Sequence, residues 1–274
     1  MLGALVGDIN GSIFQYNNGP KNKRFRLFTK DMYFTDDSLL TIAVAEVLDR
    51  KNPFKTSFTI SEFKKDLVKT FVLYVKRYKH LEYGLSFYNW AHGETGYQPY
   101  ESFGNGAAMR ISPVGWIGET EEEVKVLAQA VTKITHNHSD SYDAAEAVSM
   151  AIFMARKGYS KEEIRKYVVT NYYPEIEGLE YNKLVRDYDF DVTCKGTVPV
   201  AIYAFLISES FEDCLRTAIS IGGDTDTLAA ISMSIAEAYY YKKENLSYFY
   251  EEVTNYLDFD LYLIFKSFMQ KYVK

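Results

Sequence analysis

The chain has 274 residues, of which 47% are hydrophobic and 25% charged, the composition of an ordinary globular protein with a sizeable core. Its net charge of −6 and isoelectric point near 5.4 argue against general nucleic-acid binding, which requires a basic face. Two cysteines without a ligand spacing argue against a disulfide framework or a zinc site. No stretch is apolar enough to cross a membrane, and the first residues lack a secretory signal pattern, so we expect a cytoplasmic protein.

Most of the chain follows helical periodicity, and convincing strand alternation is scarce. Thr120, Ser160 and Ser210 are start signals, and Ser139 or Asp140 is the expected cap of a further helix. With six prolines and no low-complexity linker, the pattern predicts one all-α domain over residues 1–274. The predicted helices cover residues 2–13, 36–49, 60–79, 121–134, 140–157, 161–169, 198–207, 211–220, 225–241, 244–256 and 259–271.

The first interruption, residues 17–33, reads NNGPKNKRFRLFTKDMY and is basic with aromatic residues between. Both a solvated connection and a lid over an anionic ligand fit it. Thr35, Asp36 and Asp37 follow at the head of an apolar-periodic run. A single Thr or Asp there is explained by helix capping. Two adjacent carboxylates repel each other, so capping alone is a weak account of this start.

The second interruption, residues 97–116, contains Gly104, Asn105 and Gly106, followed by the small residues of a helix start. Glycines permit left-handed or extended angles, and a glycine turn before a helix exposes amides that suit phosphate or sugar oxygens. A plain tight turn fits equally well. His136 and His138 precede the next helix, either as a polar loop or as ligand contacts, and no third soft ligand for zinc is spaced nearby.

Near the C-terminal end, IGGDTDTLAAISMSIAEAYY places alternating Asp and Thr residues at the start of an apolar helix. Such a cluster of oxygen ligands exceeds what one cap needs and suits a hard cation such as Mg²⁺. If this start meets the one after residue 34, four carboxylates converge, and such a cluster requires cations or protons. Two-metal sites of this type position and activate water.

Taken together, GALVGDINGS, FTDDSLLTIAVAE, SFGNGAAMRISPVGW, THNHSDSYDAAEA and GGDTDTLAAISMSIAEA resemble the ordered motifs of the ADP-ribosylglycohydrolase family. They run from residue 3 to about residue 240. The resemblance implies an all-α, Mg²⁺-dependent hydrolase with two metal ions that releases ADP-ribose from a modified protein or small molecule. It breaks the bond between C1″ of the distal ribose and the acceptor, and the acceptor itself (arginine, serine, a base or a guanidino compound) stays open.

The resemblance also implies roles for individual residues. By matching motif, the metal ligands are Thr35, Asp36, Asp37, Asp224, Asp226 and Thr227. The implied substrate-binding residues are Ser102, Phe103, Gly104, Asn105, Gly106 and His136. Bond cleavage passes through an oxocarbenium-like state, and Asp36 or Asp226 is the expected base that deprotonates the attacking water.

One departure concerns residue 15, where the family usually has a glutamate beside the metals and this chain has Gln15. An amide keeps the shape but cannot accept a proton at neutral pH. Three explanations stay open: a weakened or retuned hydrolase, an ADP-ribose-binding protein without turnover, or an introduced substitution. A purely structural helical protein is a further alternative, in which both acidic helix starts serve only as caps.

Overall fold

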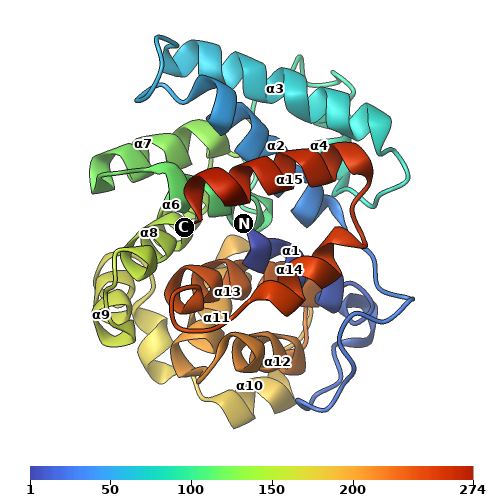
Figure 1. Ribbon diagram of the computed structural model, residues 1–274, viewed down its shortest axis with the longest axis vertical. Coiled ribbons are helices and arrows are strands. Elements are labelled where there is room, and N and C mark those ends of the chain that lie inside the picture. The colour runs from blue at the N-terminus through green and yellow to red at the C-terminus, as the bar shows by residue number, and fades with distance from the viewer. Residues whose placement is uncertain (274) are drawn as a thin grey trace.

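Residues 1–273, which the computed structural model describes, form helices joined by loops, and no β-strand occurs among them (Figure 1). A single isolated bridge joins Gly104 to Thr193. The prediction of an all-α fold is therefore confirmed. The helices are α1 (Leu2–Gly11), η1 (Gln15–Asn17), α2 (Asp36–Lys51), α3 (Ile60–Arg77), α4 (Leu85–Ala91), α5 (Gly106–Met109), α6 (Ser112–Ile117), α7 (Glu121–Thr132), α8 (Ser139–Arg156), α9 (Lys161–Asn171), η2 (Pro174–Gly178), α10 (Tyr181–Asp187), α11 (Cys194–Ile207), α12 (Phe211–Ile221), α13 (Thr225–Tyr240), α14 (Ser247–Thr254) and α15 (Phe259–Tyr272).

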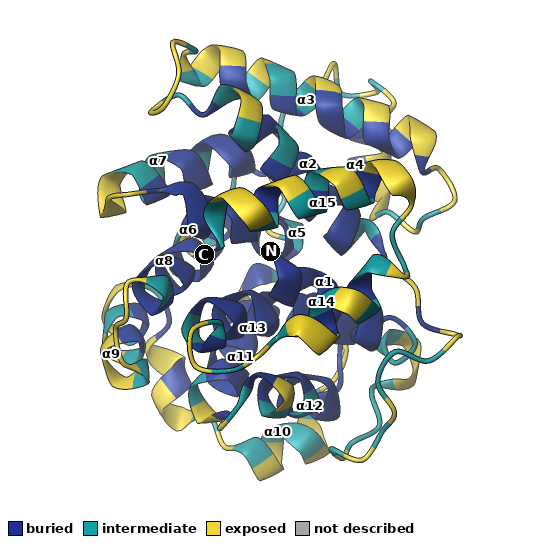
Figure 2. Ribbon diagram, viewed as in Figure 1, coloured by how far each residue is buried: buried dark blue, intermediate teal, exposed yellow. Residues whose placement is uncertain are grey.

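Helix α13 forms the centre of the core. Nearly all of its residues are buried, and it packs against α1, α8, α11 and α12 (Figure 2). A helix that is buried on every side must be small and apolar all round, as the run LAAISMSIA is. The polar residues at its N-terminus are buried as well, so they require a partner other than bulk water.

Three glycines on α1 allow that helix to approach α13 closely. Gly3, Gly7 and Gly11 recur every four residues and therefore line one face of α1. A Cβ atom at Gly7 would lie 2.3 Å from the carbonyl of Ala229, and one at Gly11 would lie 2.5 Å from Cα of Asp226. No side chain fits into this contact. The glycine face therefore fixes the position of α1 beside the first turn of α13.

Each helix predicted from periodicity is present, whereas the short helices α4, α6 and α10 were not predicted. They have seven residues or fewer, too few to show a period. Helix α11 begins at Cys194, four residues before its predicted start, although Pro199 lies inside it. The predicted cap of α8 at Ser139 or Asp140 was wrong: His138 is the N-cap, and its Nδ1 accepts from the amide of Asp140.

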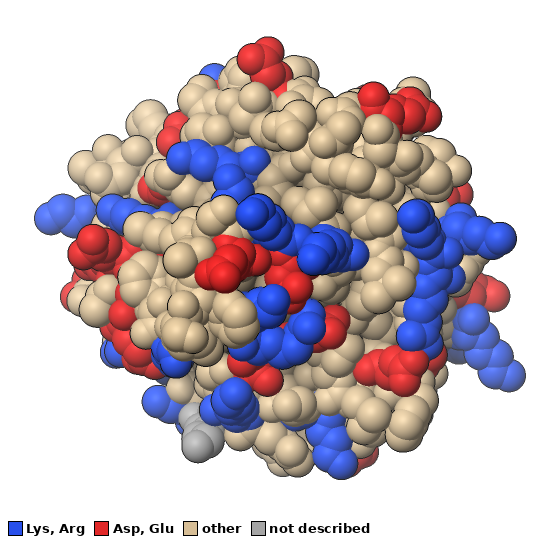
Figure 3. Space-filling view, turned by 90° about the horizontal axis from the view of Figure 1, so that it is seen from above, with Lys and Arg blue, Asp and Glu red and all other residues tan. Residues whose placement is uncertain are grey.

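The basic segment 17–33 packs onto the protein. Lys21 donates to the backbone carbonyls of Tyr188 and Ile221, and Lys23 forms an ion pair with Asp213 on α12. These lysines are committed to structural contacts, which disfavours the interpretation of the segment as a lid over an anion. On the face shown in Figure 3, basic and acidic side chains are interspersed among uncharged ones. Among residues 1–273, no helix is both long and apolar enough to span a membrane.

The glycine contact predicts a specific loss of stability. Replacing Gly7 with alanine inserts a methyl group against the backbone of α13 and should lower the free energy of unfolding by about 3 kcal/mol or more, since neither backbone can move away cheaply. Urea denaturation followed by circular dichroism measures this. The matched control is Gly178→Ala, because a Cβ at this exposed glycine meets no atom within 4 Å. Equal stability of the two variants would contradict the close packing.

Candidate active and metal-binding site

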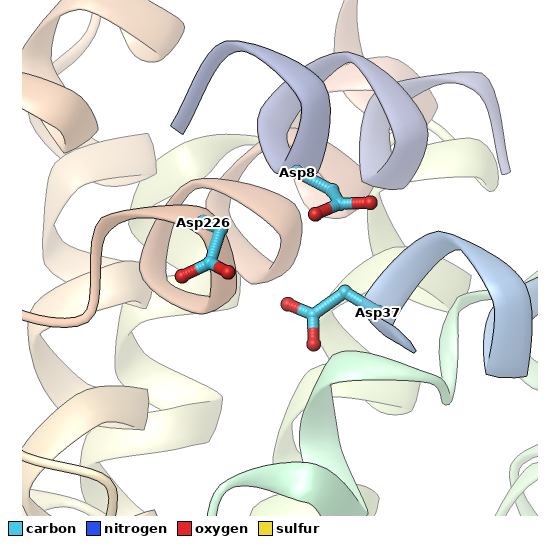
Figure 4. Close-up of side chains that lie close together, drawn as sticks. All are labelled: Asp8, Asp37 and Asp226. Atoms are coloured by element: carbon cyan, nitrogen blue, oxygen red, sulfur yellow. The ribbon is translucent and has the colours of Figure 1, made fainter. Parts of the chain in front are cut away.

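The two acidic helix starts lie together. The N-termini of α2 and α13 face each other across the end of α1, and carboxylate oxygens of Asp8, Asp37 and Asp226 lie within 4.8 Å of one another (Figure 4). A cavity of about 520 Å³ opens above them, and its lining includes Asp36, Asp37, Asp224 and Asp226. The two acidic helix starts therefore meet in space, as the predicted metal site requires.

Asp8 holds the start of α2 in place. Its Oδ2 accepts from the amides of Thr35 (2.9 Å) and Ser38 (3.1 Å), and its Oδ1 accepts from the Thr35 hydroxyl at 2.7 Å. Three of its roughly four acceptor positions are therefore occupied. Asp8 projects from the helix that the glycine contact fixes to α13, so it sets the position of Asp37 relative to Asp226.

Asp37 and Asp226 each present an oxygen without a partner. Oδ2 of Asp37 and Oδ1 of Asp226 are buried and accept no hydrogen bond within residues 1–273. Burial raises the pKa of both carboxyls well above the usual range, and neighbouring carboxylates raise it further. Such orphaned buried oxygens are costly unless a proton or a cation satisfies them. The oxygen-only donor set fits a hard divalent cation.

The pKa values of the other carboxyls in the cluster are raised as well. Burial and the charges of Asp8 and Asp224 raise the pKa of Asp36 to about 8, although its side chain is only half-buried. Burial raises the pKa of Asp8 to about 6, although the hydrogen bonds that Asp8 accepts from Thr35 and Ser38 lower it. Burial also raises the pKa of Asp224. Without a cation, the cluster therefore retains protons at neutral pH.

Helix capping explains only part of these polar residues. Thr35 is the N-cap of α2, and its hydroxyl accepts from the amide of Asp37. Asp224 occupies the N-cap position of α13 but makes no capping hydrogen bond with its side chain. It accepts instead from Asn105 Nδ2 at 2.7 Å. The alternative in which both acidic starts are mere caps therefore fails for α13.

The loop of Gly104, Asn105 and Gly106 does not use the left-handed angles that its glycines permit. Neither glycine has a positive φ, and Asn105 is near-helical with φ of −64°. Its amides are also largely used: Gly104 donates to Ser102 Oγ, and Asn105 donates to the carbonyl of Val192. His136 packs over Gly106, and a Cβ there would lie 3.6 Å from the imidazole, at ordinary contact distance. All three residues line the cavity.

Arg110 and His136 lie next to each other, buried behind this loop. Arg110 Nη2 donates to Thr135 Oγ1 at 2.6 Å, and its guanidinium lies over the rings of Phe71 and Phe87. Burial, with the charge of Arg110 as a smaller cause, lowers the pKa of His136 well below its usual value, so its imidazole is neutral. Both residues line the cavity, where Arg110 supplies a fixed positive charge near the carboxylates.

The other predicted site residues divide between cavity and surface. Gln15, Ser102 and Thr227 line the cavity, and Thr35 lines a neighbouring one. Phe103 does not line the cavity: its ring is about half exposed and lies 5.8 Å from the ring of His138, and its contact with the substrate stays a prediction. Its backbone instead accepts from Cys194, which anchors the loop to α11.

Sequence reasoning missed Asp8 and Arg110. Asp8 lies inside the GDINGS motif, one residue after a glycine of the close-packed face, and an isolated Asp in an otherwise apolar helix was an available signal. Arg110 follows Met109 at the end of the glycine loop, and only its burial distinguishes it from a surface arginine. Tyr16 and Glu82 also line the cavity, and no local pattern marks them.

Comparisons of the sequence and of the fold with known proteins point to the same family. The family model described as ADP-ribosylglycohydrolase matches residues 1–242. The mouse (Mus musculus) protein ADP-ribosylhydrolase ARH3 is 24% identical over 310 residues, covering 88% of this chain and 82% of that protein. The ADP-ribosyl-[dinitrogen reductase] glycohydrolase of Rhodospirillum rubrum is 27% identical over 270 residues, covering 87% and 83%. A solved structure described as an ADP-ribosylglycohydrolase-related protein complex superposes with a TM-score of 0.65 at 20% identity, covering 93% of this chain and 96% of that one, and so shares the fold.

The raised pKa values predict a pH-dependent response to Mg²⁺. The folded pKa of Asp36, about 8, exceeds its ordinary value of 3.8, so the folded cluster binds more protons and loses stability as pH rises from 3.8 to about 8. Bound cations remove this penalty by displacing those protons. The rise in melting temperature on adding Mg²⁺ should therefore be larger at pH 8 than at pH 6.5.

Differential scanning fluorimetry with and without Mg²⁺ at each pH measures this difference, because groups remote from the cluster titrate equally in both samples. Asp37→Asn is the matched variant, and it should show a much smaller shift. An Mg²⁺ response that is independent of pH, or that survives unchanged in Asp37→Asn, would refute the role of the carboxylate cluster.

Proposed function

The chain belongs to the ADP-ribosylglycohydrolase family, and on this premise we propose that it hydrolyses the bond between ADP-ribose and a modified acceptor. The observation that supports this most is the pair of orphaned carboxylate oxygens, on Asp37 and Asp226, at the floor of a cavity of about 520 Å³. The relatives named as ADP-ribosylhydrolase and ADP-ribosyl-[dinitrogen reductase] glycohydrolase cover nearly the whole chain. We expect an ADP-ribosylated protein or small molecule to be the substrate.

In this proposal the distal ribose lies at the carboxylates, and the rest of ADP-ribose extends toward the loop and His136. Ser102 and His136 line that end of the cavity, together with the Gly104–Gly106 loop. A neutral imidazole can donate or accept a hydrogen bond with a sugar hydroxyl without adding charge. The positive charge of Arg110, buried next to His136, favours the binding of an anionic ligand at this end.

Two Mg²⁺ ions are the proposed cofactor, and the residues present fit them. The donor set consists of carboxylates and hydroxyls, with two oxygens that have no other partner. When bound, such ions supply Lewis-acid polarisation of the ribose hydroxyls and of a water. The residues that would hold them are Thr35, Asp36, Asp37, Asp224, Asp226 and Thr227.

The chain's own carboxylates provide the acid–base chemistry. Asp36 or Asp226, both on the cavity wall, accepts a proton from the attacking water as its oxygen bonds to C1″. As the bond from C1″ to the acceptor breaks, the acceptor takes up the proton that the carboxylate accepts from water, so the carboxylate is regenerated. Negative charge beneath the ribose stabilises the oxocarbenium-like state between these events. Asp8 takes no part in proton transfer and only positions the start of α2, through the hydrogen bonds that it accepts there.

Gln15 supports a second candidate, an ADP-ribose-binding protein with little or no turnover. Gln15 begins η1 and lines the cavity beside Asp36 and Asp226. Its amide can hydrogen-bond to a sugar or a water but cannot take up a proton. Where general acid–base catalysis is missing, rates fall by about 10²- to 10⁴-fold while binding persists.

Restoring a carboxylate at this position distinguishes the two candidates. We expect Gln15→Glu to raise the rate of ADP-ribose release by about 10²-fold or more, because the new carboxylate can transfer a proton. Release is measured by chromatography from arginine- and serine-linked ADP-ribosyl peptides in the presence of Mg²⁺. Asp37→Asn in the same background is the negative control and should be inactive.

The results of these assays distinguish a hydrolase from an ADP-ribose-binding protein. Turnover by the unaltered chain shows a hydrolase, whereas binding of ADP-ribose without product, with activity gained in Gln15→Glu, shows a binder. If neither chain binds ADP-ribose nor releases it with Mg²⁺ present, the proposed function is wrong.

A further inference from the structure

A second cavity lies beside the first and shares its carboxylates. It has a volume of about 700 Å³. Five residues line both cavities: Gln15, Tyr16, Asp36, Glu82 and Asp226. The carboxylates of Asp36 and Asp226 thus lie between two separate spaces, one toward the glycine loop and one toward the loop after α14.

A hydrogen bond between Tyr16 and Glu82 spans the cleft where the cavities adjoin. The Tyr16 hydroxyl donates to Glu82, joining η1 to the loop between α3 and α4. Both side chains are exposed. Glu82 forms no ion pair with any lysine, arginine or histidine in residues 1–273. A carboxylate accepts about four hydrogen bonds, so most of its capacity is available.

We infer that this second cavity holds the acceptor, and that the acceptor it suits is the guanidinium of an ADP-ribosylated arginine. The inference rests on the proposed function, which places ADP-ribose in the first cavity with C1″ at the shared carboxylates. The group bonded to C1″ on the side away from the glycine loop then extends into the second cavity.

The walls of the second cavity suit a flat cation. Tyr33, Phe34 and Tyr256 supply aromatic rings, and Glu82 supplies a carboxylate. A guanidinium stacks on aromatic faces and donates to a carboxylate in a fork, whereas a serine linkage presents only a neutral oxygen. Lys30 is the single lysine or arginine in the lining, and it is exposed at the surface.

The second cavity is open enough to admit a side chain that belongs to another protein. Lys30, His80, Glu82 and Asn255 of its lining are all exposed, so its mouth faces solvent. Tyr256 is held by a hydrogen bond from its hydroxyl to the carbonyl of Thr29 at 3.0 Å. This bond positions one of the aromatic rings that would contact the acceptor.

The test compares binding of three probes in the presence of Mg²⁺: ADP-ribose, an arginine-linked ADP-ribosyl peptide and a serine-linked one. The unaltered chain should bind the arginine conjugate more tightly than ADP-ribose. Glu82→Gln keeps the shape and the bond from Tyr16 but removes the charge, and should weaken the arginine conjugate about tenfold. Because Glu82 also lines the first cavity, the affinity for ADP-ribose can fall too, but it should fall by a clearly smaller factor than the affinity for the arginine conjugate. If the conjugates are cleaved, kcat/KM gives the same comparison.

Glu94→Gln is the charge-matched control, since this exposed carboxylate lines neither cavity. The inference is overturned if Glu82→Gln affects both conjugates and ADP-ribose alike, or if the serine conjugate is the one that Glu82→Gln weakens. Failure of the unaltered chain to bind any probe would instead refute the proposed function, and the inference with it. Binding of ADP-ribose without discrimination between the conjugates overturns the inference alone.

Discussion

The contact between the glycine face of α1 and the backbone of α13 determines the rest of the site. Because Gly7 and Gly11 have no side chain, the two helices approach until a Cβ would overlap the opposite backbone. This approach brings Asp8 beside Asp226, and the hydrogen bonds of Asp8 then fix the first turn of α2. The positions of Asp37 and Asp226 thus follow from packing in the core, which is far more rigid than a surface loop.

The same arrangement is unfavourable for the empty protein. Several carboxylates share a buried space, and burial and their mutual repulsion raise their pKa values, because ionising them together is unfavourable. Function and stability are therefore in opposition until a cation binds. The hydrogen bond from Asn105 to Asp224 links the glycine loop to this centre, so the region proposed for substrate and the region proposed for metal form one unit.

Periodicity was sufficient to predict the long helices and the all-α class, because amphipathic or wholly apolar runs leave a clear pattern. It missed short helices such as α6, whose formation depends on burial. The clustering of Asp36, Asp37, Asp224 and Asp226 was predictable as a hypothesis, since capping could not explain so many carboxylates. The role of Asp8 and the burial of Arg110 were not, because each depends on contacts between distant segments. Phe103 was assigned to the substrate site by its place in a motif, and its half-exposed ring is not part of the cavity lining.

The proposed cation site lies between two helix starts, whose positions depend on the core packing of α1 and α13. A crystal grown with Mn²⁺ tests it most directly, because anomalous scattering locates the ion independently of any assumption about its ligands. We expect anomalous peaks in contact with the free oxygens of Asp37 and Asp226. A fully occupied Mn²⁺ bound elsewhere, with no peak between those two carboxylates, would contradict the proposed site.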